Sequence, residues 1–357
     1  MPETLKILYV APLNDRSTSL YRKWALERAG QQIIPLDMQE WVNLGSGLKG
    51  KIAFRLATTL GIGPVVRAFN RELLRLAREH RPDVMWGDKL TYLKPATLEA
   101  LRAMGIVTVN YTIDNPFGPR RDPGWGLYMK CIPHYDLHIV QRDQNIVDYK
   151  SRGGRDVLKI QTAYETTINF PPPAGWSDKD RDREVSFVGT PYDERPAFLL
   201  RLKREFSIPV AVNGARWMWA KRMNPAEMRE IFNGDEIYLG EYREAIWRSK
   251  INLSFITHSN QDEFAHKSFE IAGCGGFLLA ERSAGHMERF VEDEEAVFFS
   301  DAEECAEKIC RYLPDEAARA RIAAAGYARA VAGGYNNDGQ VAKILERVRT
   351  ILTGLSK

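Results

Sequence analysis

The sequence has few of the features that mark membrane, secreted or metal-stapled proteins. No apolar run approaches the roughly 18 residues that a membrane-spanning helix needs. The N-terminus lacks the basic start and long apolar stretch of a secretory signal. The cysteines show no CxxC spacing of the kind found in zinc sites, and a disulfide framework is not expected for Cys131, Cys274, Cys305 and Cys310. These absences lead us to expect a protein of the reducing cytoplasm.

Signatures of two common nucleotide- and nucleic-acid-binding classes are also missing. A dinucleotide-binding dehydrogenase would carry GxGxxG after its first strand, but the loop after Leu5–Val10 has no such run. The net charge is only +3 and no nucleic-acid-binding motif is present, which argues against a DNA- or RNA-binding protein. The charge is uneven, since residues 1–165 contain 24 Lys and Arg against 17 Asp and Glu. An acidic surface or ligand is therefore one expected partner of this half, and a solvated surface with an arginine bias is the alternative.

Short apolar runs that are typical of buried strands alternate with helical segments along most of the chain. Leu5–Val10 and Ile106–Tyr111 are such runs in the N-terminal half, and Val185–Val188 and Ile251–Phe255 are such runs in the C-terminal half. This alternation predicts an α/β fold with parallel sheets covered on both faces. Because 357 residues exceed what one hydrophobic core usually serves, we expect two domains.

Residues 166–184 interrupt the alternation. They contain Pro171-Pro172-Pro173 and the charge run Asp178–Glu184, a composition that favours an extended, solvated connector. The predicted organisation is therefore an N-terminal domain over 1–165, a linker over 166–184, a C-terminal domain over 185–334 and a C-terminal helix over 335–357. Ligands of open α/β sheets lie beyond the carboxyl ends of the strands, so we expect the functional residues in the loops there.

The most informative segment runs from Asp262 to Leu279, where an acidic pair precedes a predicted helix, a glycine-rich break and a buried strand. The free N–H groups and positive dipole end of a helix N-terminus suit a diphosphate, and Lys267 adds a positive charge there. Glu270, on the same helix, can accept hydrogen bonds from two ribose hydroxyls. The glycines that follow allow the backbone to approach a ligand closely. The segment therefore predicts a nucleotide-binding site.

This segment resembles the donor-site motif of the GT-B glycosyltransferases, in which an acidic residue, seven others and a Glu precede a small-residue Cys-Gly turn. Asp262, Glu270 and Cys274-Gly275 hold that spacing. The run Ser268–Leu279 is most similar to the CgeB-like (spore-maturation type) branch of these enzymes. Further matches to that branch lie at Val185–Thr190, Arg195, Tyr238–Tyr242 and Ser249–Phe255. The resemblance covers about residues 185–330 well and the N-terminal half only in outline.

The resemblance implies two Rossmann-like domains that face each other across a cleft, with the C-terminal helix as a candidate to cross back to the N-terminal domain. It implies a nucleotide-sugar donor, with a UDP-sugar as the first expectation, bound by the C-terminal domain. The donor-binding residues that it implies are Gly189, Thr190, Arg195, Tyr238, Gly240, Tyr242, Lys267, Ser268 and Glu270. Asp262 takes the catalytic position at which the family usually has Glu. Lys267 stands where the family often has Arg, which keeps the charge but not the planar fork.

Simpler interpretations of these residues stand beside the functional ones. Glu270 and Lys267 would then be ordinary residues of a helix surface, Asp262 a helix cap, and Arg195 a surface ion-pair partner. Cys274 is interpreted as a small buried filler rather than a nucleophile.

The N-terminal half supplies the candidates for activating an acceptor hydroxyl. A transferase that inverts the sugar carbon needs a base to deprotonate that hydroxyl as it attacks. Asp15 and Asp114 lie in loops directly after predicted strands, and His134 is a further candidate. Turn capping is the alternative role for both aspartates, and His134 has the alternative of an ordinary loop residue.

Residues 49–81 form a second feature of the N-terminal half. They hold eight Lys and Arg against two Glu, interleaved with apolar side chains. One hypothesis is an amphipathic surface for anionic lipid or an acidic glycan, which would place the protein peripherally on the inner surface of the membrane. The alternative is a core helix with an arginine-rich outer face.

The leading functional hypothesis is transfer of a sugar from a nucleotide sugar to a hydroxyl acceptor, which is a glycan, a protein or a small molecule. No bound metal is expected, because a helix dipole and basic residues can offset the leaving-group charge. The only DxD-like run, Asp180-Arg181-Asp182, follows no strand, which argues against a metal-dependent transferase of the other common architecture. A nucleotide-sugar epimerase of the same fold and a non-catalytic nucleotide-sugar-binding protein are the alternatives.

Overall fold

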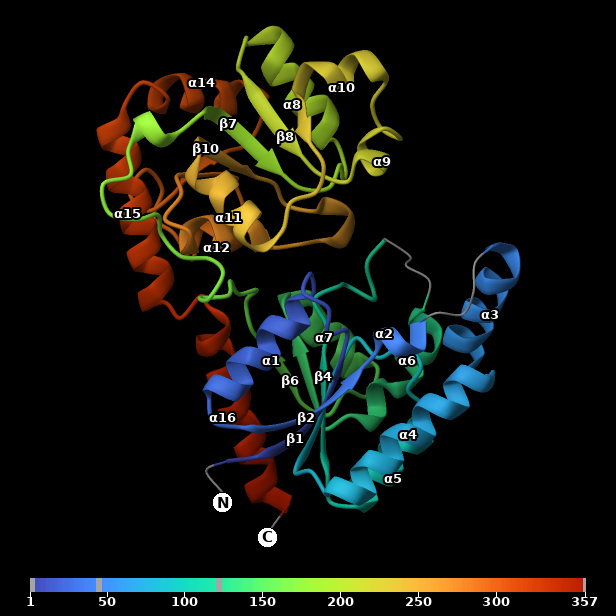
Figure 1. Cartoon of the computed structure of the whole chain (residues 1–357). Helices are drawn as coiled ribbons and strands as arrows, with labels where there is room; N and C mark the ends of the chain where they lie inside the picture. Colours follow the sequence, from blue (N-terminus) through green and yellow to red (C-terminus); the bar gives the residue numbers. More distant parts are fainter. Residues whose placement is uncertain (1–3, 43–46, 120–123, 356–357) are drawn as a thin grey trace. The chain divides into compact units, whose positions relative to one another are not determined.

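The computed structural model describes residues 4–42, 47–119 and 124–355, and it divides the chain into two compact units. Residues 1–161 and 337–357 form the N-terminal unit, and residues 162–336 form the C-terminal unit. Each unit is built on one parallel sheet with helices around it (Figure 1). The predicted α/β fold with two Rossmann-like domains is therefore confirmed.

The N-terminal sheet has the strand order β2-β1-β3-β4-β5-β6. Its strands are β1 (Lys6–Ala11), β2 (Gln32–Asp37), β3 (Val84–Asp88), β4 (Val107–Tyr111), β5 (Leu137–Val140) and β6 (Val157–Lys159). Strands β1, β3 and β4 are almost wholly buried, as strands of a parallel sheet covered on both faces should be. The helices of this unit are α1 (Thr18–Arg28), α2 (Gln39–Val42), α3 (Gly47–Leu60), α4 (Pro64–His80), α5 (Pro95–Ala103), α6 (Trp125–Cys131), α7 (Asp143–Ser151) and α16 (Asn337–Leu355).

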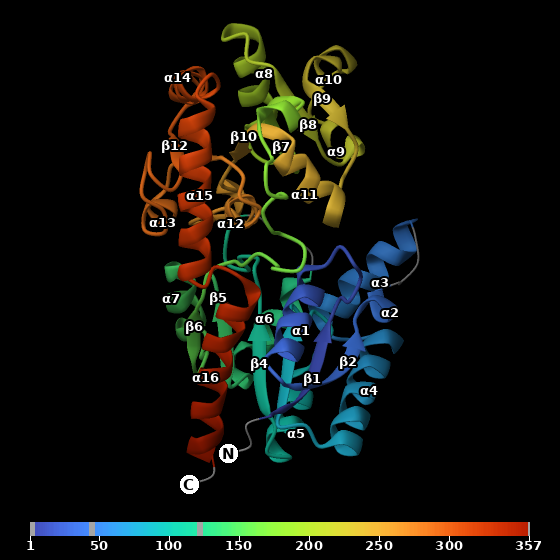
Figure 2. The same ribbon diagram turned by 60° about the vertical axis from the view of Figure 1, so that its left-hand side comes forward.

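Helix α16 returns from the end of the chain to complete the N-terminal unit. Its buried side chains pack with those of β1, β3 and β4 in one core: Val341, Ile344, Leu345 and Val348. Two ion pairs hold the helix, Arg28–Asp338 at 2.8 Å near its start and Arg347–Asp156 at 2.6 Å near its middle. Figures 1 and 2 both show α16 lying beside α1. The expectation that the C-terminal helix crosses back is therefore confirmed.

The C-terminal sheet has the strand order β12-β11-β10-β7-β8-β9. Its strands are β7 (Arg183–Val188), β8 (Val210–Asn213), β9 (Phe232–Gly234), β10 (Ser249–Ser254), β11 (Leu278–Glu281) and β12 (Val297–Phe299). Its helices are α8 (Arg195–Glu205), α9 (Arg216–Trp219), α10 (Pro225–Ile231), α11 (Leu239–Trp247), α12 (His266–Gly273), α13 (Ala284–Met287), α14 (Ala302–Tyr312) and α15 (Glu316–Ala332). Because α12 follows β10, its first turn lies beyond the carboxyl end of that strand, where a ligand of the sheet is expected.

The segment predicted as a linker, residues 166–184, is instead a packed part of the C-terminal unit, which begins at Thr162. Two indole N–H groups fix it: Trp247 Nε1 donates to the Phe170 carbonyl at 3.0 Å, and Trp176 Nε1 donates to the Trp247 carbonyl at 3.1 Å. An ion pair between Asp178 and Arg319 of α15 adds a third contact. Trp247 of α11 takes part in both of these hydrogen bonds and so holds the segment in place. The domain boundary therefore lies earlier than predicted.

The short apolar pattern of Ile237–Leu239 predicts a strand, but the structure has none at these residues. The structure places a strand at β9, and α11 begins at Leu239 with Tyr238 as its N-cap residue. The buried residues Tyr242, Ala245 and Ile246 follow the three- and four-residue spacing of a helix face, and this packing decides the conformation.

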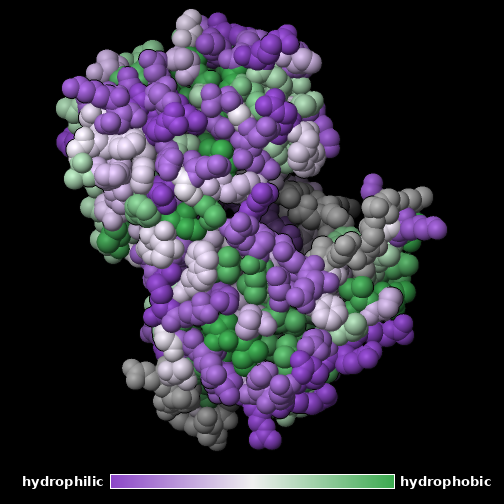
Figure 3. All heavy atoms as spheres, viewed as in Figure 1, coloured by the Kyte–Doolittle hydropathy of each residue, from purple (hydrophilic) through white to green (hydrophobic). Residues whose placement is uncertain are grey.

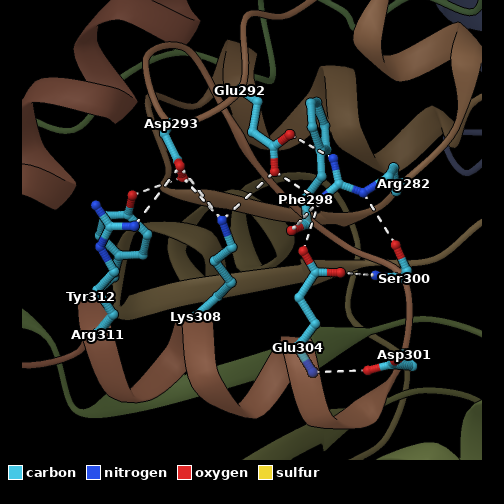
Figure 4. A network of polar contacts seen from close by, with 10 residues as sticks. All are labelled: Arg282, Glu292, Asp293, Phe298, Ser300, Asp301, Glu304, Lys308, Arg311 and Tyr312. Atoms are coloured by element: carbon cyan, nitrogen blue, oxygen red, sulfur yellow. Dashed lines mark hydrogen bonds and ion pairs between the residues drawn. The ribbon is translucent and has the colours of Figure 1, made fainter.

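A surface network holds the loop after β11 (Figure 4). Arg282 binds both oxygens of Glu292, at 2.5 and 2.8 Å, and binds Glu304 of α14 at 2.7 Å. The neighbouring Asp293 accepts a hydrogen bond from the Tyr312 hydroxyl at 2.8 Å. Arg282 directly follows the last residue of β11, so the network fixes the chain at the carboxyl end of this strand.

No single helix among the described residues is long and apolar enough to cross a membrane, although α3 and α4, bent by 50°, pass the same length and composition test as a pair.

Candidate functional site

The first turn of α12 brings an ionised carboxylate and a lysine together at the carboxyl edge of the C-terminal sheet. Glu270 accepts a hydrogen bond from the Tyr242 hydroxyl at 2.9 Å and pairs with His266 Nε2 at 3.2 Å. Burial alone would raise the pKa of Glu270, but His266, Lys267 and the Tyr242 hydroxyl outweigh it and hold the pKa at about 2. The carboxylate is therefore negative at neutral pH and keeps lone pairs for further donors.

Lys267 lies on the same face of α12 as Glu270. Its Nζ is 4.5 Å from the centre of the Tyr242 ring, a cation–π contact. Burial lowers the pKa of Lys267, and the charge of Glu270 opposes that shift. The part of the chain that the structure describes offers this ammonium no hydrogen-bond acceptor. Lys267 is half-buried, so water solvates its ammonium only in part, and an anionic ligand would supply the missing acceptors.

Gly189, directly after β7, lies against Lys267. A Cβ added at Gly189 would lie 3.3 Å from Lys267 Cε and 2.7 Å from the Phe187 ring, so only glycine fits without movement. Its N–H donates to the Asn213 carbonyl at 2.9 Å, and its carbonyl accepts from Trp219 Nε1 at 3.0 Å. Gly189 therefore gives the site room, while its own backbone groups are used inside the fold.

Arg195, predicted to bind phosphate, braces two loops. Its guanidinium donates to the carbonyls of Thr190, Phe255 and Ile256 at 3.0–3.2 Å and to the Thr257 hydroxyl at 2.9 Å. Thr190 takes part through its backbone. The side chain is 8% exposed, and its charge lies close enough to Lys267 to lower that group's pKa. The surface ion-pair alternative is therefore wrong, and the visible role of Arg195 is to join the loops after β7 and β10.

Ser268, also predicted to contact the donor, is fully buried and faces the sheet. Its hydroxyl lies 2.9 Å from Ser254 Oγ of β10 and 2.9 Å from His286 Nε2. Residues one apart on a helix point about 100° away from each other, so Ser268 turns inward where Lys267 turns outward. The predicted ligand contact of Ser268 is wrong.

His286 anchors the start of α12 from α13. Its Nε2 accepts the Ala265 N–H at 3.1 Å, and its Nδ1 lies 2.8 Å from the Glu281 carbonyl, so the neutral ring is protonated at Nδ1. Burial lowers the pKa of His286 to about 4. No sequence pattern identifies His286, because a histidine that supports a neighbouring helix belongs to no motif.

The remaining predicted donor residues lie around α11 and before α12. Tyr242 contacts Glu270 directly, whereas Tyr238 is the N-cap residue of α11 and Gly240 belongs to its first turn rather than to a loop. Asp262 accepts a hydrogen bond from Asn260 Nδ2 at 2.8 Å. The N-cap residue of α12 is Ala265, so the helix-cap interpretation of Asp262 is wrong.

A second polar cluster lies at the carboxyl edge of the N-terminal sheet. Asp88, the last residue of β3, pairs with Arg22 at 2.5 Å, and the Arg22 guanidinium lies 4.1 Å from the centre of the Tyr111 ring. Burial raises the pKa of Asp88, against the lowering effect of Arg22. Sequence reasoning missed Asp88, although an acidic residue at the end of a buried strand is the signal that selected the other aspartates.

The predicted base candidates differ in their surroundings. Asp114 forms an ion pair with Lys89, whose Nζ is also 4.6 Å from the centre of the Trp125 ring. Asp15 is exposed in the loop after β1. His134 precedes β5 and lies near Glu99, at the amino end of that strand, so it is not among the strand-end loops. Within the described residues, no group of three His, Cys, Asp or Glu side chains gathers as metal ligands.

A pH effect follows from His286. The folded protein keeps this ring neutral in a pH range where the unfolded chain, with a pKa of about 6.5, binds a proton. The free energy of unfolding should therefore fall as the pH drops from 6.5 toward 4, by about 2 kcal/mol between pH 7 and pH 5 from this group. Denaturant unfolding at both pH values measures it: His286→Gln should show the smaller pH dependence, with His134→Gln as the control. Equal pH dependence of the wild type and His286→Gln would contradict the assignment.

Comparisons with known proteins agree with this geometry. Residues 195–346 match a family model described as glycosyl transferase-like. Sucrose-phosphate synthase from Thermosynechococcus elongatus is 13% identical, with a TM-score of 0.68 and coverage of 98% of this chain and 100% of that chain. A glycosyltransferase from Rickettsia africae is 12% identical, with a TM-score of 0.66 and coverage of 98% and 99%. Anabaena Alr3699/HepE in complex with UDP-glucose is 13% identical, with a TM-score of 0.63 and coverage of 96% and 100%.

No curated protein matches the sequence. The matches favour the transferase hypothesis over the epimerase and binding-protein alternatives, and none of them distinguishes the CgeB-like branch. The chain therefore has the fold of the GT-B glycosyltransferases, and its C-terminal unit carries most of a glycosyl transferase-like sequence match.

Proposed function

We propose that this protein is a glycosyltransferase that moves a sugar from a nucleoside-diphosphate sugar to a hydroxyl acceptor. The observation that carries the proposal is the pair on α12: a half-buried Lys267 ammonium, for which the described residues provide no hydrogen-bond acceptor, beside the ionised Glu270. One group suits a diphosphate, and the other suits the donor hydroxyls of a ribose. Support for a UDP-sugar as the first candidate comes from HepE, whose structures contain UDP, UDP-glucose, or UDP with glucose.

In this proposal each residue has one task. The Lys267 ammonium, together with the N–H groups at the start of α12, stabilises the negative charge that develops on the leaving diphosphate. Glu270 orients the nucleotide, while Tyr242 and His266 hold its carboxylate in place. Arg195 and His286 position the loops and the helix start around them. The N-terminal unit binds the acceptor, and Asp114 or Asp15 acts as the base that deprotonates the acceptor hydroxyl.

The first test is ligand binding by the whole chain. Thermal melting with UDP, GDP, dTDP and their sugars should show a rise in Tm with at least one of them, because a ligand that binds only the folded state stabilises it, by about 2.7 kcal/mol at a hundredfold excess over Kd. Glu270→Gln should weaken that binding roughly tenfold or more, since the lost bonds to charged acceptors are worth about 1.5–3 kcal/mol. Glu241→Gln, an exposed change on α11, is the matched control.

The proposed donor site is wrong if none of these nucleotides shifts Tm or gives heat on titration at millimolar concentration. If binding occurs but Glu270→Gln and Glu241→Gln behave alike, the nucleotide binds elsewhere.

A second test concerns metal ions. Because Lys267 and the start of α12 provide the positive charge for the diphosphate, we propose that turnover needs no divalent cation. Activity measured with EDTA should therefore equal activity measured with added Mg²⁺ or Mn²⁺. Loss of activity in EDTA that Mg²⁺ or Mn²⁺ restores would show that a metal shares this task.

A further inference from the structure

Helix α3 and the turn that follows it expose an unusual set of apolar side chains. Ile52, Leu56, Leu60 and Ile62 are 42–54% exposed, and they fall within eleven consecutive residues. On α3 the first three recur every fourth residue, so they form one stripe along the outer side of the helix. Figure 3 shows hydrophobic surface on the side of the molecule that carries α3 and α4.

The inner side of α3 is already occupied. Ala57 is buried in the core with α4 and β3, and the Phe54 ring contacts the Tyr92 ring edge-on at 6.3 Å between centroids. Thr59 packs against Gly126 of α6, where an added Cβ would lie 2.7 Å from Thr59 Cα. The apolar stripe is therefore a second face of a helix whose first face already holds it in the fold.

Basic side chains flank this stripe. Lys49, Lys51 and Arg55 of α3 are exposed, as are Arg67 and Arg71 of α4, and none forms an ion pair with a described residue. The only acids between residues 49 and 81 are Glu72 and Glu79, and both pair with Arg75. This surface therefore combines exposed aliphatic side chains with positive charges that no described acidic residue offsets.

We propose that α3 and the α3–α4 turn bind the protein to the surface of a bilayer that contains anionic lipids. The stripe of Ile52, Leu56 and Leu60 would enter the boundary between headgroups and acyl chains, and the lysines and arginines would meet the lipid phosphates. The mode is surface binding, because the apolar face of α4 (Val66, Phe69, Leu73 and Ala77) lies in the core of the N-terminal unit.

Charge and hydrophobicity together favour an anionic bilayer over two other partners, a second copy of the chain and a soluble acidic polymer. A second copy of the chain would bring two uncompensated basic faces together, which like-charge repulsion opposes. A soluble acidic polymer would engage the basic groups but would leave the aliphatic stripe in water. A bilayer surface with anionic headgroups uses both parts of this face.

The experiment is co-sedimentation of the full chain with vesicles of phosphatidylcholine alone and of phosphatidylcholine mixed with phosphatidylglycerol. Binding should require phosphatidylglycerol and weaken as salt is raised. The triple variant Ile52→Ser/Leu56→Ser/Leu60→Ser should bind at least about tenfold more weakly. Lys51→Glu/Arg55→Glu should bind about tenfold more weakly at low salt and show less salt dependence. Val147→Ser and Lys150→Glu, exposed changes on α7, are the matched controls and should bind as the wild type does.

Three outcomes would overturn the proposal. One is no binding to either vesicle. Another is loss of binding in the charge variant alone, with the serine variant unaffected, which would indicate a soluble polyanion as the partner. The third is a dimer without lipid that the serine variant converts to a monomer. An unchanged Tm of each variant shows that it folds, and the vesicle assay does not depend on the donor or on turnover.

Discussion

Replacement of the base that activates the acceptor should reduce turnover by roughly a hundredfold to ten-thousandfold, and we expect Asp114→Asn to show this loss more strongly than Asp15→Asn. Asp114 follows β4 and is oriented by its ion pair with Lys89, whereas Asp15 is exposed after β1. A base acts in the transition state, so the loss should appear in kcat while the Kd of the donor stays nearly unchanged. Steady-state kinetics and donor titration of both variants measure these quantities.

The control is Asp148→Asn, a change on α7. If Asp15→Asn and Asp114→Asn both keep near-wild-type turnover, no aspartate base acts at these positions. The leaving diphosphate would then be the better acceptor of the proton, as in a reaction that retains the configuration at the sugar carbon.

Lys267→Met should separate stability from activity. Removing the ammonium that meets the leaving diphosphate should lower kcat by about a hundredfold to a thousandfold, the range found when one preorganised charge-stabilising group is lost. In the protein without ligand, the same change removes a half-buried, partly desolvated cation that has no hydrogen-bond acceptor among the described residues, so Tm should stay equal or rise. Melting curves and kinetics of the same preparation measure both effects.

Two further variants sharpen this result. Lys267→Arg should recover part of the activity, because it restores a donor to phosphate, and Lys250→Met, elsewhere in the C-terminal unit, should leave turnover unchanged. A fall in the Tm of Lys267→Met together with unchanged turnover would mean that Lys267 supports the fold and not the reaction.

The sequence predicted the core of the candidate site because that core is local. Lys267 and Glu270 are three residues apart, so a helix places them on one face wherever the helix lies. Tyr242, which the family resemblance implied, also belongs to the cluster and comes from α11. Helix geometry also explains why Ser268 does not join them. One step along the helix turns its side chain toward the sheet, where it contacts Ser254.

The sequence pattern does not predict contacts between segments that are distant in the chain. Nothing near His286 shows that its ring meets Ala265 and Ser268. Asp88 was missed because the apolar pattern does not show that β3 continues to this charged residue, and its partner Arg22 is distant in the sequence. The composition of residues 166–184 predicts a linker because it is rich in proline and charge. Composition does not show the hydrogen bonds of Trp176 and Trp247 that hold this segment against the C-terminal unit.

The return of α16 has a consequence for how the protein is made. Residues 1–161 emerge from the ribosome long before residues 337–355, yet side chains of both segments share one core. Until α16 has been synthesised, one face of the nascent N-terminal sheet lacks the cover of Val341, Ile344, Leu345 and Val348. The C-terminal unit is complete in sequence at residue 336, so it can reach its native state while the first-made unit still waits for its last helix.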